Sequence, residues 1–343
     1  MADFDVSKGW VILLPQDPGV KKAAEDAARC IGLLRKQAGL SSPPPALADA
    51  SGPAPPPSVP VIVLNSEQGP AEQNGFSWRA GPERVEIYGE SSRGLCNGIY
   101  SFLAALGIRW PEPGKELLPP CADKPAVYPL ASPGASEPSR FYGTGPEKAP
   151  WKRYVIDRKN PFLKSAGKRE ALIAWAARNR CDALVFPLKT AGKYSKSAGE
   201  YALAAEAGGW ELSLLLPRRL FLFHSECFRM EDGRRRKEIN FCPTNPATLR
   251  ILKKEAKKYF RNGRNLRIFH LWPDRGNEKT WCSCPACRAF SPAEQNRIAV
   301  SAAADALLES GFTGFISYYE APGEGGDIPL RPNLFRMERM PET

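Results

Sequence analysis

The stretch that decides the fold is residues 266–287, LRIFHLWPDRGNEKTWCSCPAC. Residues 266–271 form a short apolar run of the kind that makes a buried strand. The run stops at Trp272, Pro273 and Asp274, and a polar loop follows. A buried strand that ends in an aromatic ring, a proline and a carboxylate is typical of how an α/β barrel places a reactive group. The stretch therefore predicts a barrel strand with a functional residue at its end.

Working outward from this strand, the chain after residue 150 alternates between apolar runs and helical patterns. Such alternation, with nearly continuous apolar strands, predicts a parallel sheet covered by helices. A (β/α) barrel of TIM type is the leading interpretation, and a doubly wound sheet is the alternative. Only about five units fit, against the eight that close a barrel, so the barrel is expected to be incomplete at its C-terminus. The expected strands are 153–157, 183–188, 211–216, 266–271 and 314–319, and the expected helices are 167–180, 197–207, 245–260 and 292–310.

The first 120 residues show a different pattern, which predicts a small N-terminal α/β sandwich. A strand at 9–15 precedes a helix with an apolar face at 20–37, and a serine-capped helix follows a strand near residue 86. Residues 76–79 and 84–88 are expected to form a hairpin. Residues 41–60 are rich in proline and are expected to be a flexible insertion, and residues 121–150 a linker. The barrel portion then occupies residues 151–343.

Composition bounds the class of protein. An apolar content of 43% and a charged content of 25% are ordinary for a soluble globular protein. No apolar run approaches the roughly 20 residues that cross a bilayer, so no membrane partner is expected. The start, MADFDVSKGW, lacks the basic region and long apolar stretch of a secretory signal. We therefore expect a bacterial, cytoplasmic protein whose nine cysteines mostly stay reduced.

The formal net charge of +11 has two interpretations. It could mark a surface for nucleic acid or another acidic polymer, or it could reflect solvated helix faces and loops. Dense basic runs are confined to residues 234–237 and to a helical stretch at 253–258, and no zinc-finger, helix-turn-helix or RNA-binding signature accompanies them. Nucleic acid is therefore disfavoured as a partner, whereas an anionic sugar is compatible with the charge.

Three segments carry a resemblance to a known group of proteins: residues 86–114, residues 223–246 (FHSECFRMEDGRRRKEINFCPTNP) and residues 272–287. Their order resembles a bacterial family of uncharacterised carbohydrate-active proteins. Members pair an N-terminal domain similar to that of α-glucuronidases and family 20 hexosaminidases with a glycoside-hydrolase-like barrel. The resemblance implies a carbohydrate partner, an oligosaccharide or glycoside, and no required cofactor.

This chain also departs from the family pattern. Relatives carry a Gly-His pair near the end of the third barrel strand, whereas the expected third strand at 211–216 has no histidine and no polar group suited to a sugar. The missing barrel units are a second difference. Both favour an alternative function, a non-catalytic glycan-binding or scaffold protein derived from a glycoside hydrolase.

Two carboxylates fit the chemistry of glycosidic hydrolysis, which uses one group as acid and another as nucleophile or base. Asp274 follows the fourth expected strand and Glu320 the fifth, at the ends where barrels keep their active sites. We predict an O-glycosyl hydrolase in which Asp274 is the general acid/base and Glu320 its partner. The alternative for each is a loop carboxylate that caps a helix or pairs with Arg275 or Arg331.

Aromatic and polar residues beside the strand ends are candidates for sugar binding. Rings there could stack on a pyranose, although they are also ordinary packing residues. Asp157 could instead pair with Arg158 or Lys159, and a lone loop histidine is often only a structural residue. The resemblance places residues 223–246 near the rim of the active site. The predicted substrate-binding residues are Trp272, Tyr318, Tyr319, Asp157, His224 and Glu226.

The three cysteines of the opening stretch need their own explanation. Thiolates at the spacing of Cys282, Cys284 and Cys287 suit a tetrahedral zinc ion, for which Cys242 or His270 could supply the fourth ligand. The alternative is one disulfide, or three partly buried thiols that stabilise a long loop. A structural zinc site is thus one interpretation. A catalytic cysteine is disfavoured because no Cys/His/Asn arrangement is visible.

Overall fold

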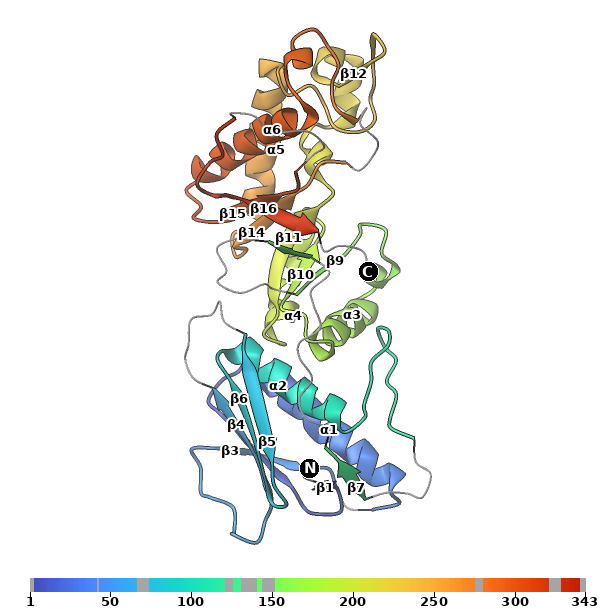
Figure 1. Cartoon of the computed structure of the whole chain (residues 1–343), viewed down its shortest axis with the longest axis vertical. Coiled ribbons are helices and arrows are strands. Elements are labelled where there is room, and N and C mark those ends of the chain that lie inside the picture. The colour runs from blue at the N-terminus through green and yellow to red at the C-terminus, as the bar shows by residue number, and fades with distance from the viewer. Residues whose placement is uncertain are drawn as a thin grey trace.

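The computed structural model describes residues 3–41, 43–66, 74–120, 126–130, 141–143, 152–274, 280–320 and 328–339. Two α/β units lie at opposite ends of an elongated molecule (Figure 1). The N-terminal unit is a small sheet with two helices, and the other is a curled, mostly parallel sheet with helices around it. Within the described ranges, no helix combines the length and the apolar character needed to span a membrane.

In the N-terminal unit, two helices cover one face of a five-stranded sheet (Figure 1). The expected hairpin is present, since β5 and β6 pair antiparallel, whereas the other neighbours pair parallel. Ser91 caps α2 by accepting a hydrogen bond from the amide of Gly94 at 3.0 Å. The elements are β2 (Val11–Leu14), α1 (Lys21–Gln37), β3 (Ala46–Asp49), β4 (Val61–Ser66), β5 (Phe76–Ala80), β6 (Arg84–Gly89) and α2 (Ser92–Ala105).

Segments that were expected to be a loop and a linker contribute strands instead. Strand β3, within the expected insertion at 41–60, pairs in parallel with β2. From the expected linker, β7 (Val127–Pro129) pairs with β1 (Asp3–Asp5), and β8 (Phe141–Gly143) pairs with β16 (Leu334–Arg339). These strands have three or four residues and lie at sheet edges, so their backbone hydrogen bonds form without the buried apolar pattern that marks a strand in sequence.

The larger sheet has the order β8-β16-β15-β14-β11-β10-β9, and the last six of these strands run parallel. It curls into a half barrel, which supports a partial TIM-like barrel over the doubly wound alternative. The sequence predicted four of its six parallel strands, β9, β10, β14 and β15, and missed β11 and β16. The elements are β9 (Arg153–Val155), α3 (Ala166–Arg178), β10 (Ala183–Phe186), α4 (Ala191–Gly199), β11 (Ala204–Gly209), α5 (Pro246–Asn262), β14 (Ile268–Leu271), α6 (Pro292–Leu308), β15 (Phe315–Tyr318) and β16 (Leu334–Arg339).

The third barrel unit lies earlier in the sequence than expected. Strand β11 falls where a helix was expected at 197–207, and the expected strand at 211–216 is largely a short 3-10 helix, Leu212–Leu215. The sequence of β11, AAEAGG, has no large apolar residue, whereas the leucines after it are buried in a turn. Small residues are required because β11 packs closely on β14. A Cβ on Gly208 would lie 1.9 Å from the carbonyl oxygen of His270.

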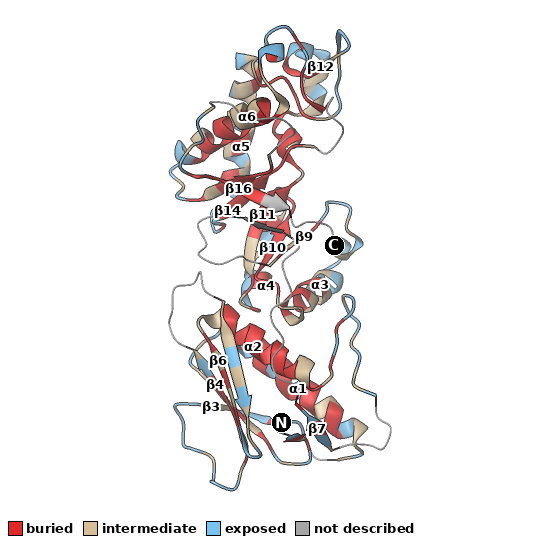
Figure 2. Ribbon diagram, in the orientation of Figure 1, coloured by how far each residue is buried: buried red, intermediate tan, exposed pale blue. Residues whose placement is uncertain are grey.

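The half-barrel sheet separates two apolar clusters. On the side of the helices, Phe269, Leu271, Ile316 and Tyr318 join the main core. On the inner face, a smaller cluster contains Ile268, Trp272, Tyr319, Phe335 and Met337. This alternation along β14 and β15 is the period of two expected for strands. Figure 2 shows the strands of this sheet as largely buried.

Buried polar contacts join the two units. Arg93, at the start of α2, donates hydrogen bonds to the carbonyl oxygens of Ala177 and Tyr201, both at 2.9 Å. The carboxylate of Asp26 on α1 accepts two hydrogen bonds from Arg178 at the end of α3, at 2.7 and 2.8 Å. The arginine side chains therefore satisfy backbone groups and a carboxylate that the interface removes from water.

Candidate functional site at the strand C-termini

Inside the curled sheet, four strands contribute polar side chains to one buried layer. Arg153 of β9 donates two hydrogen bonds to Glu206 of β11, at 2.8 and 3.1 Å. The same carboxylate lies 2.7 Å from Nε2 of His270 on β14. The Nδ1 atom of His270 is hydrogen bonded to the hydroxyl of Ser317 on β15, which also accepts from the indole of Trp272 at 3.0 Å. The Nε2–H tautomer of His270 satisfies every group in this chain of contacts.

The charge state of this layer follows from its partners. Burial by itself raises the pKa of Glu206, but the charge of Arg153 and the hydrogen bonds from His270 and Arg153 outweigh it and lower the pKa to about 2. Glu206 therefore stays ionised at neutral pH, as one member of a buried, paired network. Glu206 was not predicted as a site residue, because its position was expected in a helix.

Three aromatic rings lie above the polar layer, at the C-terminal ends of the strands. Trp210 stacks on Tyr319 with ring centroids 5.1 Å apart and planes 3° from parallel. Trp272 meets both rings edge-on, at 5.3 and 4.8 Å. Trp272 is fully buried, Tyr319 is 8% exposed, and Trp210 is partly exposed. Trp210, which was not among the predicted residues, is therefore the ring of this cluster that solvent reaches most. Tyr318 lies on the other face, in the core under the helices.

Asp274 is held by a loop from another part of the chain. Its Oδ2 atom accepts a hydrogen bond from the amide of Asn240 at 2.8 Å, and Arg218 lies 4.0 Å from the same oxygen. The amide of Asp274 donates back to Oδ1 of Asn240 at 3.0 Å. The carboxylate is 24% exposed. The alternative partner Arg275 lies outside the described residues.

Glu320 pairs with a helix rather than with Asp274. Arg297 of α6 binds its carboxylate with two parallel hydrogen bonds, at 3.1 and 3.2 Å. The expected alternative partner, Arg331, pairs with Asp305 instead. Among the contacts of the described residues, Asp274 and Glu320 thus have different partners, although both follow neighbouring strands at the same edge of the sheet.

Two further carboxylates lie at this edge, beyond β9 and β11. Asp157 is exposed and accepts a hydrogen bond from the amide of Lys159 at 2.7 Å, which forms a turn rather than a salt bridge. Arg158 pairs with Glu211, whose carboxylate also accepts from the amide of Leu188 at 2.7 Å. Burial, together with the charge of Asp157, raises the pKa of Glu211. The sequence predicts Glu211 inside a strand, whereas the structure places it just after the end of β11.

His224 and Glu226 form an exposed pair on the long connection between β11 and α5. The Nδ1 atom of the histidine is 3.3 Å from the Glu226 carboxylate, and both side chains are 52% exposed. The neighbouring Leu222 and Phe223 are each 81% exposed. The structure therefore places this segment at the surface.

The cysteines gather away from the polar layer. Cys242 joins Cys282, Cys284 and Cys287 in a buried cluster whose sulfur atoms all lie within 4.8 Å of one another. All four are free thiols, so none of them forms a disulfide. His270, the other candidate for a fourth ligand, is bound to Glu206 and Ser317. The cluster could hold a metal ion.

Three lysines of the basic helix α5 form ion pairs with nearby carboxylates. Lys253 and Lys257 contact Glu309 at 2.9 and 2.7 Å, and Lys258 contacts Glu255. These exposed pairs favour the interpretation of a solvated helix face over that of a nucleic-acid surface.

The fold resembles that of family 20 glycoside hydrolases. The structure of Flavobacterium johnsoniae chitobiase, of that family, matches with a TM-score of 0.56 and 13% identity over 93% of this chain and 50% of the chitobiase. A family 20 exo-β-N-acetylglucosaminidase from Vibrio harveyi, solved with N-acetylglucosamine, matches with a TM-score of 0.55 and 12% identity. The match covers 97% of this chain and 54% of that enzyme. A β-N-acetylhexosaminidase from Bacteroides fragilis matches with a TM-score of 0.53 and 14% identity, over 98% of this chain and 66% of that enzyme.

This chain therefore spans about half to two thirds of the length of these structures. At such low identity the likeness concerns the fold alone. No protein-family model matches the chain, and no curated protein matches its sequence.

Proposed function

We propose that the chain is a carbohydrate-active protein that binds a saccharide at the C-terminal edge of its half-barrel sheet and hydrolyses an O-glycosyl bond there. The observation that carries the proposal is the aromatic platform of Trp210 and Tyr319, which stands at the same edge of the sheet as the carboxylates that follow β9, β11, β14 and β15. A sugar ring has apolar faces that pack on aromatic rings, and its hydroxyls bind carboxylates. The chemistry needs two carboxyl groups and no cofactor.

In this proposal Asp274 is the general acid/base and Glu320 its partner. Both contacts that described residues make with the Asp274 carboxylate fall on Oδ2, so Oδ1 is the oxygen that would exchange a proton with the glycosidic oxygen. Arg297 holds Glu320 in a fixed orientation through two hydrogen bonds, which leave further lone pairs on each oxygen for a water or a sugar. Trp272, beneath the platform, fixes the rings in place.

The first substrates to test follow from the neighbours in fold. Because the similar structures include β-N-acetylhexosaminidases and one complex with N-acetylglucosamine, aryl N-acetyl-β-hexosaminides come first. Aryl glycosides of acidic sugars come second, because the chain carries a net charge of +11.

The test compares Asp274→Asn with Glu309→Gln. Glu309 lies at the end of α6, on the opposite side of the barrel unit, and serves as the matched carboxylate control. We expect Asp274→Asn to lose at least 100-fold in turnover while keeping its thermal unfolding midpoint, because general acid/base catalysis contributes about 10²–10⁴-fold. Glu309→Gln should keep full turnover. Equal activity of the two variants would refute the role of Asp274.

A second function is favoured by the contacts of the two carboxylates. Asp274 is bound by Asn240, and Glu320 by Arg297, as in a site that holds its side chains for structure. A glycan-binding protein without turnover would use the same aromatic platform. Calorimetric binding of N-acetylglucosamine oligomers, with no release of product from any aryl glycoside, would support this second function.

A further inference from the structure

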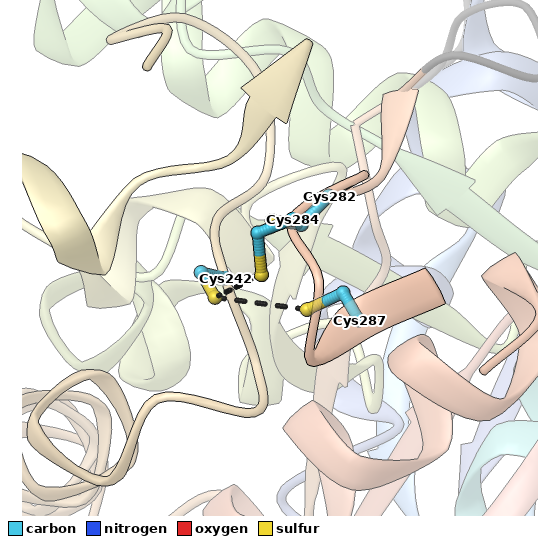
Figure 3. A group of neighbouring side chains, drawn as sticks. All are labelled: Cys242, Cys282, Cys284 and Cys287. Atoms are coloured by element: carbon cyan, nitrogen blue, oxygen red, sulfur yellow. Dashed lines mark hydrogen bonds between the residues drawn. The ribbon is translucent and has the colours of Figure 1, made fainter. Parts of the chain in front are cut away.

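Four buried sulfur atoms converge from two loops at the C-terminal side of the half barrel. Cys242 precedes α5, and Cys282, Cys284 and Cys287 follow β14 (Figure 3). Their exposed fractions range from 0 to 4%, and they form a cluster separate from both cores of the barrel. The Sγ atom of Cys242 lies 3.7 Å from that of Cys284 and 3.6 Å from that of Cys287.

These distances are those of a tetrahedral ligand set. With Zn–S bonds of about 2.3 Å, the corners of a tetrahedron are about 3.8 Å apart. A disulfide needs a sulfur separation of about 2.05 Å. The observed separations therefore match thiolates that share one metal ion. Four cysteine ligands fill every position of such an ion, which is the composition of a structural site rather than a catalytic one.

The surroundings supply hydrogen-bond donors to the sulfur atoms. The amide of Met230 donates to Cys282 at 3.2 Å, and the guanidinium of Arg235 approaches the same sulfur at 3.8 Å. The hydroxyl of Thr244 lies 3.0 Å from the sulfur of Cys287. Four thiolates around a divalent cation carry a net charge of −2, and such donors stabilise that charge and orient the ligands.

The cysteine loop is also fixed from the side of the helices. Buried Gln295, on α6, accepts a hydrogen bond from the amide of Cys282 at 3.1 Å and donates to the carbonyl oxygens of Cys282 and Phe290. A turn closes the loop, with the amide of Cys287 donating to the carbonyl oxygen of Cys284 at 2.9 Å. These hydrogen bonds orient the loop that carries Cys282, Cys284 and Cys287.

Next to the cluster lies a strained turn that binds Asp274. Ile239 and Asn240 have φ angles of 55° and 31°, in the left-handed region that a β-branched residue rarely adopts. The side chain of Asn240 donates to the carbonyl oxygen of Thr280 at 3.1 Å. Asn240 and Thr280 stand two residues before Cys242 and Cys282, so both pairs link the same two loops.

We propose that Cys242, Cys282, Cys284 and Cys287 bind one zinc ion, which clamps the two loops together and thereby holds the Asn240 turn against Asp274. The metal assignment stands independently of any hydrolytic activity. Zinc is chosen over softer or redox-active metals because four thiolates in tetrahedral geometry suit Zn²⁺, with iron as the competing ion.

The first experiment measures metal content. The full chain, prepared with added zinc sulfate and desalted, is analysed by inductively coupled plasma mass spectrometry, and about one zinc per chain is expected. Cys284→Ser should lose the zinc, whereas Cys96→Ser, which replaces a buried free thiol of the N-terminal unit, should keep it. Wild-type protein without zinc, with bound iron, or with a disulfide among these four cysteines would overturn the proposal.

The second experiment tests the clamp. Hydrogen exchange is followed by NMR before and after zinc is removed with a chelator. The amide of Asn240, which donates to Asp274, should lose at least tenfold in protection, and the amide of Ile87 in the N-terminal sheet should not change. Unchanged protection at Asn240 would show that the metal does not hold this turn.

Discussion

Asn240 and Asp274 bind each other twice, each donating its backbone amide to the side-chain oxygen of the other, at 2.8 and 3.0 Å. The two residues are 34 positions apart and belong to different loops. A reciprocal pair of this kind fixes the direction of both side chains, so the loop before α5 sets the orientation of the carboxylate that follows β14.

The first prediction concerns this pair. Asn240→Ala removes the bonds from the Asn240 side chain to Asp274 and Thr280, and it places alanine at a positive φ. We expect a loss of about 2 kcal/mol in the free energy of unfolding, because lost buried hydrogen bonds cost about 1–3 kcal/mol. Urea denaturation of Asn240→Ala and of the wild type measures this loss. An unchanged free energy of unfolding would contradict a stabilising role of these two bonds.

A second prediction concerns the buried charge of Glu206. Glu206→Gln leaves Arg153 and His270 without their carboxylate, and breaking a buried ion pair costs about 3–5 kcal/mol. Glu116→Gln is the comparison, because Glu116 pairs with Arg29 at a partly exposed site and should cost less.

The same residue predicts a dependence on pH. The pKa of Glu206 is lowered from its ordinary 4.5 to about 2 in the folded protein. A lowered pKa contributes stability that is present above the unfolded value and is lost as the pH falls toward the folded one. Wild-type stability should therefore decline between about pH 4.5 and 2. The decline should be smaller in Glu206→Gln, although Glu116, whose pKa is also lowered to about 2, still contributes. Parallel curves from urea titrations would contradict this prediction.

The fourth prediction tests the close approach of β11 and β14. Gly208 has a φ of 116°, and any Cβ there would collide with the backbone of His270. We expect Gly208→Ala to lower the free energy of unfolding by more than about 3 kcal/mol or to prevent folding, because the strands cannot separate without breaking the polar layer. Gly199→Ala, at the end of α4 with no atom near its Cβ, should gain about 0.5–1 kcal/mol. Thermal unfolding of both variants measures these changes, and a Gly208→Ala variant as stable as the wild type would contradict the prediction.

The fifth prediction concerns the aromatic platform. Trp210→Ala should weaken saccharide binding about tenfold, because an aromatic contact contributes about 0.5–1.5 kcal/mol. Trp78→Ala, which removes another partly exposed tryptophan in the N-terminal unit, should leave binding unchanged. Calorimetric titration with the saccharide that binds the wild type gives both values, and an equal effect of the two substitutions would exclude a role for Trp210.

The sequence predicted those strands that contain a run of large apolar residues and missed those that do not. Strand β14 was predicted because a short, mostly apolar run ends at Trp272 and Pro273, whereas β11 was missed because its small residues serve a close backbone contact. The buried leucines after β11 have the apolar pattern of a strand, so the third strand was expected at 211–216. As a result, Glu206 was expected in the helix before it. Apolar burial is visible in sequence, but the secondary structure that achieves it is ambiguous over short runs.

The candidate site divides in the same way. Asp274 and Glu320 were placed after the correct strands, since the position of a residue after a strand is a local property. Their partners, Asn240 and Arg297, lie 34 and 23 residues away and could not be inferred without the fold. For the cysteine cluster, Cys242 and His270 were equally suitable fourth ligands by residue type. Only the folded structure shows that Cys242 lies in the cluster and that His270 binds Glu206 instead.

The short strand β8 has a consequence for how the protein behaves in solution. An incomplete barrel leaves an open edge, and a row of unpaired amides and carbonyls there would template the addition of another chain. Strand β8 pairs antiparallel with β16 and also contacts β9, the strand at the far edge of the sheet. A three-residue segment from between the two units thus covers the β16 edge and disfavours edge-to-edge aggregation of the half barrel.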